Sequence, residues 1–446
     1  MGFRVIIMLS IFLDDFVKGR MLRPISELRP PKWESSRSTF VHNMTLPVHG
    51  WYRFPAGFSA EWVETVVQSR KGLVDGLAFL DPFAGVGTAV LAAQKAGVRA
   101  YGMEAQPFIA RIAQAKLLWH ADRKQFFDTA EAVLNTAKSR SHPVPTYPPL
   151  IQKCYTQDAI RDLHNLRSAW EELHDDSPAS ELAWLAIISI LRTSSLAGTA
   201  PWQYVLPRKA KMKPLPPYEA FRQQVQRMLS DMAILQTLEI RHDGQILQGD
   251  ARSCAGISDD SIGLVVTSPP YTNNYDYADA TRLEMTFFGE VRGWGDLQEK
   301  ARRWLIRSCS QHVSIERAKL APLLESLSDA PFLGEIVNVC ENLAQERLTH
   351  GGKKDYHLMV AAYFSDMRKA WKSLRRVCAD GSDVWFVVGD SAPYGVYVPV
   401  DRWLGELALL AGFKSYRFEK LRDRNVKWKN RKHRVPLHEG LLLVQG

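Results

Sequence analysis

The chain lacks the patterns that mark several common classes of protein. Its five cysteines are scattered, with no close pair at metal-ligand spacing, so neither a metal site nor a disulfide framework is predicted. It has no apolar run long enough to cross a bilayer, no internal repeat and no low-complexity tract. These absences favour a protein of the reducing cytoplasm that has no membrane partner.

The amino terminus does not have the features of a secretion signal. An apolar run at residues 5–13 follows a basic residue, but two aspartates close it at once and no small-residue cleavage site follows. A short helix explains the run better, and either Met1 or Met21 can be the true start. Because residues 1–40 lack periodicity, we expect a poorly ordered leader.

The bulk composition is that of a globular protein with a basic excess. The 446 residues are 46% hydrophobic and 24% charged, which allows a large core plus one or two inserted lobes. The formal charge of +9 fits a polyanionic partner, because Lys and Arg that neutralise phosphates release counterions. Many basic proteins bind no nucleic acid, so the charge alone leaves the partner open.

The first third of the chain predicts half of a nucleotide-binding α/β unit. A short apolar strand, residues 77–80, is closed by Asp81, a proline and a glycine turn. A helix over about 89–95 follows, and then a second strand over 98–103 that Glu104 closes. Strand, glycine turn, helix, strand and acid, in this order, are typical of such a unit.

The rest of the chain alternates between helical and α/β patterns. Apolar residues at helical spacing predict four helices in a region with little strand signal, at residues 109–120, 159–174, 180–191 and 218–237. We expect less regular structure in two stretches, an exposed basic loop at 207–217 and an irregular segment at 287–354. The α/β pattern returns with strands at 245–247, 262–267, 384–388, 414–419 and 440–444, and with helices at 359–376 and 401–411.

The glycine loop at residues 79–88 reads Phe-Leu-Asp-Pro-Phe-Ala-Gly-Val-Gly-Thr. Glycines after a buried strand let the backbone turn sharply and approach a ligand. The loop does not complete the three-glycine dinucleotide pattern, and no Lys follows Gly87 as a P-loop requires. An adenosine-containing cofactor without a pyrophosphate suits this loop better, although an ordinary tight turn is the alternative.

The end of the strand at residues 264–271 is the most specific feature. It reads Leu-Val-Val-Thr-Ser-Pro-Pro-Tyr, an apolar run followed by a small polar residue, two prolines and an aromatic ring. A stiff connection from strand to loop is the alternative reading, but the tetrad occurs in the same chain as the glycine loop.

Together, the two motifs resemble those of the S-adenosylmethionine-dependent DNA amino-methyltransferases, the N4-cytosine and N6-adenine family. Asp-Pro-Phe-Ala-Gly-Val-Gly-Thr resembles the first motif of that family, and Ser-Pro-Pro-Tyr resembles its catalytic signature. The stretch 51–59 and the Gly-Asp-Ala-Arg of 249–252 match further motifs more loosely. The resemblance covers about half of the chain in separated blocks, and a long helical insert divides its cofactor half.

The resemblance implies specific roles for the matched residues. The glycine loop would wrap the methionine part of S-adenosylmethionine, Glu104 would bind the ribose and Asp250 the adenine amino group. The residues expected at the cofactor are Phe54, Asp81, Phe83, Ala84, Gly85, Gly87, Thr88, Glu104 and Asp250. The expected catalytic residues are Ser268, Pro269, Pro270 and Tyr271.

The tetrad suits methylation of an exocyclic amine, whose lone pair is delocalised into the base. Ser268 and a carbonyl of the Pro-Pro bend would accept its hydrogen bonds, and Tyr271 would stack on the flipped base. Methylation of a ring carbon is disfavoured, because it needs a thiolate, usually in Pro-Cys, and no cysteine here follows a proline. A leading Ser is associated in this family more with cytosine-N4 than with adenine-N6.

Three basic segments are candidates for DNA contact, at residues 208–213, 302–307 and 420–434, although each can equally be a solvated face. The candidate residues within them are Lys209, Lys211, Arg302, Lys427, Lys429 and Arg431.

The predicted fold is α/β, a Rossmann-like methyltransferase domain with a mostly parallel seven-stranded sheet, a helical insert and a smaller recognition region. The expected segments are a leader at 1–40, a cofactor half at 41–105, a mostly helical insert at 106–240, a catalytic half at 241–286, a target-recognition insert at 287–354 and a carboxyl-terminal part at 355–446. The leading function is cytosine-N4 methylation in double-stranded DNA, with a cognate restriction endonuclease as a candidate partner. Adenine-N6 methylation, RNA methylation and a non-catalytic DNA-binding subunit remain open, as do the recognition sequence and the oligomeric state.

Overall fold

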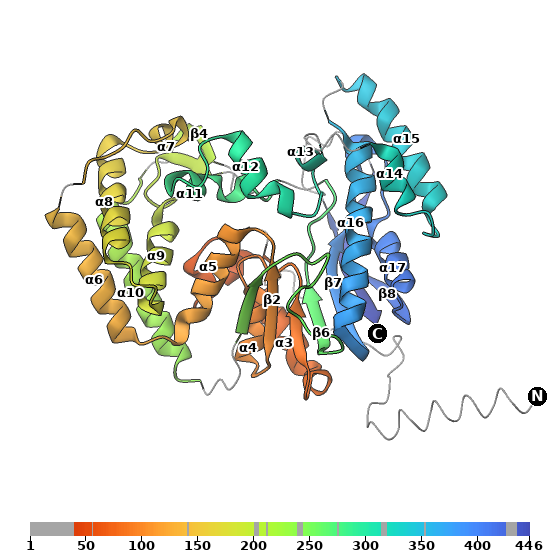
Figure 1. Ribbon diagram of the computed structural model, residues 1–446, viewed down its shortest axis with the longest axis horizontal. Helices are drawn as coiled ribbons and strands as arrows, with labels where there is room; N and C mark the ends of the chain where they lie inside the picture. Colours follow the sequence, from red (N-terminus) through yellow and green to blue (C-terminus); the bar gives the residue numbers. More distant parts are fainter. Residues whose placement is uncertain are drawn as a thin grey trace, which may run out of the picture.

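A seven-stranded sheet forms the centre of the molecule, with a helical lobe at one end (Figure 1). The structure is a computed structural model that describes residues 40–446 except 56, 141, 200–204, 211–212, 239–243, 274–275, 314–318, 352–353 and 425–434. The predicted leader at 1–40 therefore lies almost entirely outside the described residues.

The sheet is parallel except at one edge. Its strand order is β5-β2-β1-β6-β7-β9-β8; β9 runs antiparallel to both of its neighbours, and the other pairs are parallel. The strands are β1 (Ala78–Asp81), β2 (Ala100–Glu104), β5 (Gly244–Gln248), β6 (Ile262–Thr267), β7 (Cys378–Gly389), β8 (Ser415–Arg424) and β9 (Leu437–Gln445). This arrangement confirms the predicted fold class of a Rossmann-like, mostly parallel seven-stranded sheet.

Helices occupy much of the chain between the strands. The described helices are α2 (Phe40–Asn43), α3 (Ala60–Ser69), α4 (Thr88–Lys95), α5 (Pro107–Leu117), α6 (Arg123–Ser139), α7 (Pro149–Cys154), α8 (Gln157–Leu173), α9 (Pro178–Ile190), α10 (Pro217–Leu235), α11 (Arg282–Phe287), α12 (Trp294–Lys300), α13 (Ser310–Val313), α14 (Leu320–Glu325), α15 (Leu333–Thr349), α16 (Tyr356–Val377) and α17 (Val400–Leu410). In the part of the chain that the structure describes, no helix has the length and apolar character to cross a membrane.

Strand β7 shows how the sheet buries both of its faces. Successive strand residues point to opposite faces, so Trp385 and Phe386 enter different cores. Trp385 lies 6.3 Å, between ring centroids, from Trp62 of α3, whereas Phe386 stacks at 4.6 Å on Trp371 of α16. Helices α3, α4 and α5 thus cover one face, and α16 and α17 cover the other. Both cores hold the strand ends in fixed positions.

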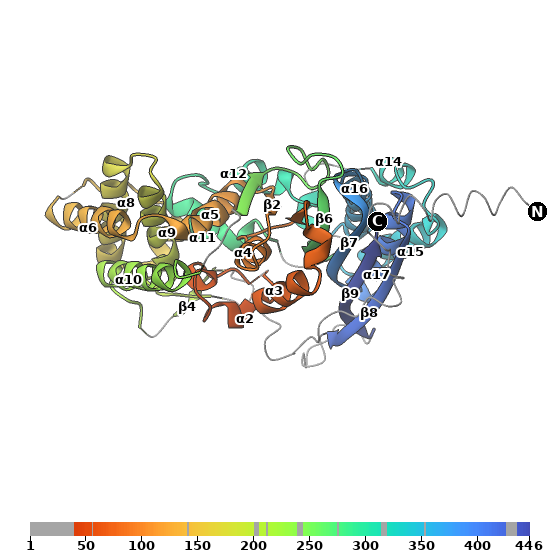
Figure 2. The same ribbon diagram turned by 90° about the horizontal axis from the view of Figure 1, so that it is seen from below.

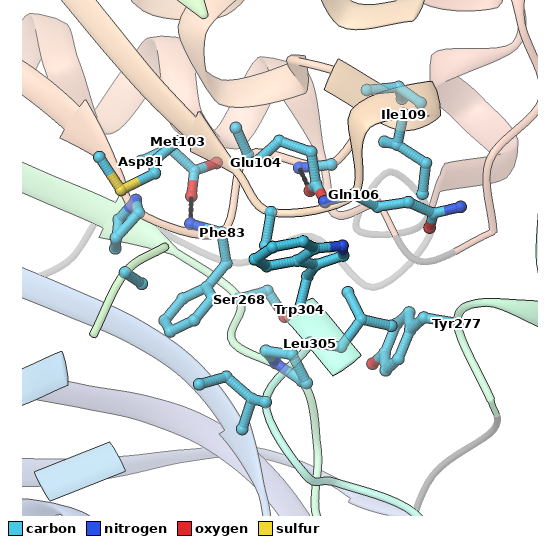
Figure 3. Close-up of a pocket in the computed structure, with 18 of the residues that line it drawn as sticks. Asp81, Phe83, Met103, Glu104, Gln106, Ile109, Ser268, Tyr277, Trp304 and Leu305 are labelled. Carbon is cyan, nitrogen blue, oxygen red and sulfur yellow. Dashed lines mark hydrogen bonds between the residues drawn. The ribbon is translucent and has the colours of Figure 1, made fainter. Parts of the chain in front are cut away.

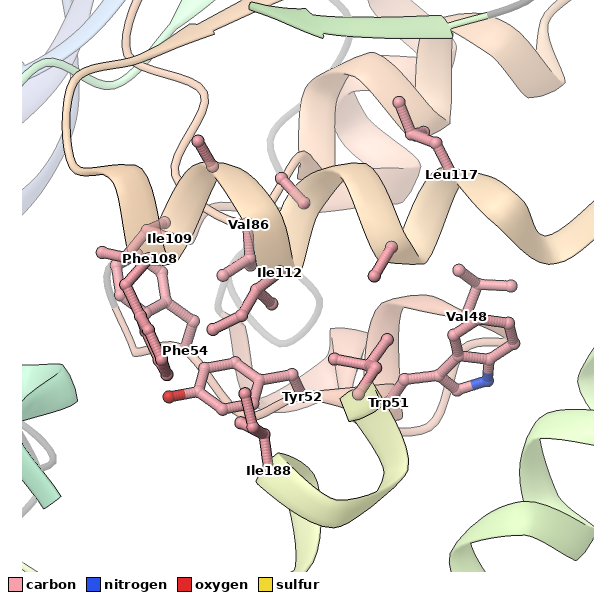
Figure 4. Packing of buried hydrophobic residues seen from close by; sticks show 14 of the residues in the cluster. Val48, Trp51, Tyr52, Phe54, Val86, Phe108, Ile109, Ile112, Leu117 and Ile188 are labelled. Atoms are coloured by element: carbon pink, nitrogen blue, oxygen red, sulfur yellow. The ribbon is translucent and has the colours of Figure 1, made fainter. Parts of the chain in front are cut away.

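The helical lobe consists of α6 to α10 and continues the core on the α5 side of the sheet (Figure 2). Figure 4 shows its junction with the sheet domain, where Tyr52 lies between Ile112 of α5 and Ile188 of α9, and Phe54 lies near Phe108. The predicted loop at 207–217 was partly wrong, because β4 (Val205–Ala210) pairs with β3 (Ala197–Thr199) in a two-stranded sheet. Backbone pairing with β3 accounts for this strand, and the prolines and basic residues gave no sign of it.

The stretch at 287–354 is mostly helical and not irregular, which corrects the sequence-based expectation. It contains α12 to α15, and its longest helix, α15, packs against α16. Ile336, Cys340 and Leu343 of α15 are fully buried at a spacing of four and three residues. This apolar stripe is too narrow to stand out in the sequence, because polar residues surround it.

We expect Gly263→Ala to destabilise the protein through the strand that carries the tetrad. A Cβ at this position of β6 would lie 1.8 Å from the carbonyl oxygen of Leu73, and backbone cannot yield as a flexible side chain does. Overpacking of this kind costs about 1–3 kcal/mol in the free energy of unfolding, measured by urea denaturation.

The matched control is Gly334→Ala in α15, where a Cβ would meet no atom within 4 Å. Alanine favours a helix over glycine by about 1 kcal/mol, so this variant should be as stable as the wild type or more so. Equal stability of the Gly263→Ala variant and the wild type would contradict the close approach of Leu73.

Candidate functional site

A cavity opens at the carboxyl ends of β1, β2 and β6, where ligands collect in open α/β sheets. It holds about 870 Å³ of space, including the solvent at its mouth. Its walls come from the 54–58 segment, the glycine loop, the ends of β2 and β6, and a segment around Trp304 (Figure 3). The lining residues are Phe54, Gly57, Phe58, Asp81, Pro82, Phe83, Ala84, Gly85, Val86, Thr88, Met103, Glu104, Ala105, Gln106, Ile109, Gly249, Asp250, Ala251, Ser268, Pro270, Tyr277, Trp304, Leu305 and Ile306.

The glycine loop reaches the cavity through a left-handed backbone. Gly85 and Gly87 have φ values of 50° and 79°, a region that residues with a Cβ rarely adopt. A Cβ on Gly85 would also lie 3.1 Å from Cε1 of Phe54 on the opposite wall. The loop therefore needs glycine both for its turn and for the width of the cavity.

Asp81 connects the glycine loop to strand β6. Its Oδ1 accepts hydrogen bonds from the Thr267 hydroxyl of β6, at 2.5 Å, and from the Phe83 amide, at 3.0 Å. The side chain is almost fully buried, and burial raises the pKa of this carboxyl to about 7, although both hydrogen bonds act in the opposite direction. Asp81 is thus held in a fixed position, and its carboxyl ionises at a higher pH than an exposed aspartate does.

Glu104 holds the other side of the glycine loop. Its carboxylate accepts hydrogen bonds from the amides of Gly85, at 3.0 Å, and Gln106, at 2.8 Å. Burial raises the pKa of this carboxyl to about 7, and the nearby charge of Asp81 adds to the rise. None of the described residues that line the cavity is a Lys, Arg or His. Two buried carboxyls without a cationic side chain suit a ligand that is itself cationic.

Asp250 lines the cavity on the side of β5, as the resemblance implied. Its carboxylate is held by Arg252, whose Nε lies 2.8 Å from Oδ2, and the Arg252 amide donates to Oδ1 at 2.8 Å. Nη1 of Arg252 also lies 3.3 Å from Oδ1 of Asp366, and Nη2 donates a hydrogen bond to the Trp304 carbonyl at 3.3 Å. Arg252 therefore links Asp250 to the Trp304 segment of the cavity wall.

The Ser-Pro-Pro-Tyr tetrad directly follows β6, and two of its residues, Ser268 and Pro270, line the cavity. The hydroxyl of Ser268 lies 3.4 Å from the Val387 carbonyl oxygen and 3.5 Å from the Tyr271 hydroxyl. Tyr271 lies outside the cavity lining, with the guanidinium of Arg424 5.1 Å above its ring. The structure thus places Ser268 in the cavity wall and Tyr271 outside it.

Several cavity residues were not singled out from the sequence. Gln106, Ile109 and the segment Trp304–Ile306 line the walls, and Figure 3 shows Trp304 in the middle of the opening. Trp304 is 42% exposed, an unusual position for so large an apolar side chain. Its sequence signal was its place beside two arginines, and nothing there indicated that it would line the same cavity as the glycine loop.

One residue that was predicted to contact DNA is buried. Arg302 is only 6% exposed, and its Nη2 and Nε lie 2.6 and 2.8 Å from Oδ2 of Asp276. A guanidinium buried in such an ion pair cannot reach a phosphate without breaking the pair, which costs several kcal/mol. The side chain of Lys209 and all of Lys211, Lys427, Lys429 and Arg431 lie outside the described part of the chain.

Comparison with known proteins gives relatives of one kind. The chain is 23% identical over 430 residues to the Type II methyltransferase M.BsoBI of Geobacillus stearothermophilus, an alignment that covers 86% of this chain and 82% of that protein. It is 24% identical over 404 residues to the Type II methyltransferases M.AvaI of Nostoc sp. (strain PCC 7120 / SAG 25.82 / UTEX 2576) and of Anabaena variabilis, with 84% of this chain and 81% of each relative covered. No protein-family model matches the chain. The similarity extends over most of the chain and is not confined to the two motifs.

We expect Asp81→Asn to change how stability depends on pH. Between about pH 4 and 7 the folded Asp81 keeps its proton while the unfolded chain has lost it, so the free energy of unfolding falls as pH rises. The slope is at most about 1.4 kcal/mol per pH unit for one such group. Asn keeps the Oδ1 acceptor but does not titrate, so urea denaturation at pH 5, 6 and 7 should give a flatter dependence.

The control for loss of a negative charge is Asp128→Asn, on the exposed surface of α6. It should leave the pH dependence close to that of the wild type. If Asp81→Asn and the wild type lose stability equally between pH 5 and 7, burial of the Asp81 carboxyl does not have the effect described here.

Proposed function

We propose that the protein is an S-adenosylmethionine-dependent DNA methyltransferase that transfers a methyl group to the exocyclic N4 amine of a flipped cytosine. The observation that carries the proposal is that the glycine loop and the Ser-Pro-Pro-Tyr strand end line one cavity. The relatives named Type II methyltransferases support the reaction class over most of the chain. On the basis of the same similarity, we propose that the protein acts in a restriction-modification system, with a cognate endonuclease as a candidate partner.

The cavity fits S-adenosylmethionine by its charge and its shape. The cofactor would supply an electrophilic methyl group next to a positive sulfur, and its amino group adds another positive charge. Asp81 and Glu104 provide the negative charges that such a ligand needs, and burial strengthens the attraction. Phe54, Phe58 and Ile109 provide apolar surface on the same walls. The glycine loop would hold the methionine part, Glu104 the ribose and Asp250 the adenine amino group.

The tetrad would orient the amine and accept its hydrogen bonds. The lone pair of the exocyclic nitrogen is delocalised into the ring, and hydrogen bonds to the Ser268 hydroxyl and a carbonyl of the Pro269-Pro270 turn would favour a more tetrahedral nitrogen. The attacking nitrogen then points into the cavity, because Ser268 and Pro270 form its wall. Tyr271 would stack on the extruded base with the ring face that Arg424 does not cover.

The double-stranded DNA would lie across the cavity mouth, above the carboxyl ends of the strands. Figure 1 shows α12 and α13 above the sheet, between the helical lobe on one side and α14 and α15 on the other. We therefore propose that target recognition uses the regions at 106–240, at 287–354, or both. Adenine-N6 methylation by the same residues is the second candidate, since Ser268 and the Pro-Pro turn would serve either amine.

The first test identifies the methylated base. Plasmid DNA from a methylation-free host that expresses the protein should contain N4-methyl-2′-deoxycytidine on mass-spectrometric nucleoside analysis. Ser268→Ala and Tyr271→Ala should each lower the yield, by about 10- to 1000-fold for the loss of a hydrogen bond or a stacking surface that the transition state uses.

The other outcomes of that experiment are equally informative. Detection of N6-methyl-2′-deoxyadenosine would support the same mechanism with adenine as the target base. Unmodified DNA from a folded protein that binds S-adenosylmethionine would contradict DNA methylation, and RNA would then be the substrate to test.

The affinity for S-adenosylmethionine should rise with pH. Asp81 and Glu104, each with a pKa of about 7, are largely protonated below pH 7, and a cationic ligand favours their ionised forms. Binding should therefore release protons. Below the pKa, the affinity should increase by up to about tenfold per pH unit for each proton that is released. Calorimetry between pH 5.5 and 8 in buffers of different ionisation enthalpy measures both effects.

S-adenosylhomocysteine is the matched control ligand, because its sulfur is uncharged. Its affinity should depend less on pH than that of S-adenosylmethionine. An affinity for S-adenosylmethionine that is constant over this range would contradict the role given to the two carboxyls.

A further inference from the structure

A buried cluster of three different donor side chains lies behind the cavity wall. Asp276, Cys309 and His312 are only 5%, 2% and 1% exposed. One carboxylate oxygen, the Cys309 Sγ and one imidazole nitrogen all lie within 4.8 Å of one another. We propose that these three residues bind a divalent transition metal ion of the zinc type.

The orientation of His312 favours a ligand role. Its Nδ1 lies 3.1 Å from the carbonyl oxygen of Ile306, an acceptor without a proton, so Nδ1 carries the hydrogen. The other nitrogen, Nε2, then faces Oδ1 of Asp276 at 3.3 Å. A neutral His312 would present a lone pair to the carboxylate there, so the arrangement needs a positive charge, which is either an ion between the two atoms or a second proton on the ring. A backbone carbonyl that orients a histidine in this way is common around metal sites.

Arg302 pairs with the Asp276 carboxylate through the oxygen that does not face His312. Its two nitrogens bind Oδ2 of Asp276 at 2.6 and 2.8 Å, which keeps the group ionised and directs Oδ1 toward His312. Second ligand shells of this kind fix the orientation of a metal-binding carboxylate. The arginine therefore leaves one oxygen of the carboxylate directed at the cluster.

The donor set and its dimensions suit zinc. Thiolate, imidazole and carboxylate are its usual ligands, at about 2.0–2.3 Å from the ion, and a tetrahedral ion places such atoms about 3.3–3.8 Å apart. The distance from Asp276 Oδ1 to His312 Nε2 already fits, and no separation between the three ligand atoms exceeds 4.8 Å. Three protein ligands leave the fourth position for a water molecule.

The ion would hold together two segments of the cavity wall. Asp276 precedes Tyr277, which lines the cavity, and Cys309 and His312 follow the lining segment Trp304–Ile306. The two segments also meet through a backbone hydrogen bond from Asn273 to Ser308 at 2.8 Å. The ion would thus stabilise the wall on which cofactor binding depends. Only this last consequence rests on the proposed function; the metal site does not.

The test begins with the full-length protein purified without chelators, loaded with Zn²⁺ and dialysed. Elemental analysis should find about one zinc per chain, and Cys309→Ser and His312→Gln should each lower the content at least several-fold. The matched control is Cys340→Ser in α15, a buried cysteine outside the cluster that donates to the His357 carbonyl; this variant should keep its zinc.

Replacement of Zn²⁺ by Co²⁺ checks the ligands directly. The wild type and Cys340→Ser should show the near-ultraviolet absorption of a cobalt–thiolate bond, and Cys309→Ser should lack it. Wild-type protein that retains no stoichiometric Zn²⁺ or Co²⁺ would overturn the proposal, whether or not the variants fold. In that case a second proton on His312 supplies the positive charge.

Cofactor binding separates this inference from the proposed function. If chelation removes the metal and weakens S-adenosylmethionine binding several-fold, the support of the wall is confirmed. If the metal binds but chelation leaves the affinity unchanged, the site stands and the coupling to the cavity is wrong. If the metal-loaded protein binds no S-adenosylmethionine at all, the proposed function fails while the metal site stands.

Discussion

The hydrogen bond from Thr267 to Asp81 is the contact on which the site depends. It joins the last residue of β6 to the last residue of β1 at 2.5 Å, in a fully buried position. Because both motifs begin at these strand ends, the bond fixes the distance between the glycine loop and Ser268. Its donor is the residue just before the tetrad, so a small shift of β6 moves the serine and the threonine together.

Much of the fold was predictable because its signals are local. Glycine turns after apolar strands and helical spacing in the 159–191 region depend on neighbouring residues, and the structure confirms the elements that they indicated. The last two strand signals coincide with β8 and β9. The two motifs could be assigned to one site, because carboxyl ends of parallel strands share one edge of the sheet.

What the sequence did not predict depends on long-range contacts. Arg302 looked like a surface cation because basic residues surround it, but its partner Asp276 lies 26 positions away in another loop. Trp304 reaches the cavity only because α12 and α13 fold back over the strand ends. Glu284 gave no sign that it would pair with Arg192 of the helical lobe at 2.6 Å. No local pattern encodes which distant partner neutralises a charge.

Charge compensation distinguishes the scaffold from the cavity. Around the site, buried carboxylates are matched by arginines, as in Glu284 with Arg192 and Asp366 with Arg307 at 2.7 Å. Asp81 and Glu104 accept only uncharged donors among the hydrogen bonds described, and the cavity that they face has no cationic lining residue. Under the proposed function, these two acids would select a cationic ligand by charge. Without a cationic ligand, ionisation of these two buried carboxyls lowers the free energy of unfolding. A cation that binds to them would therefore stabilise the fold.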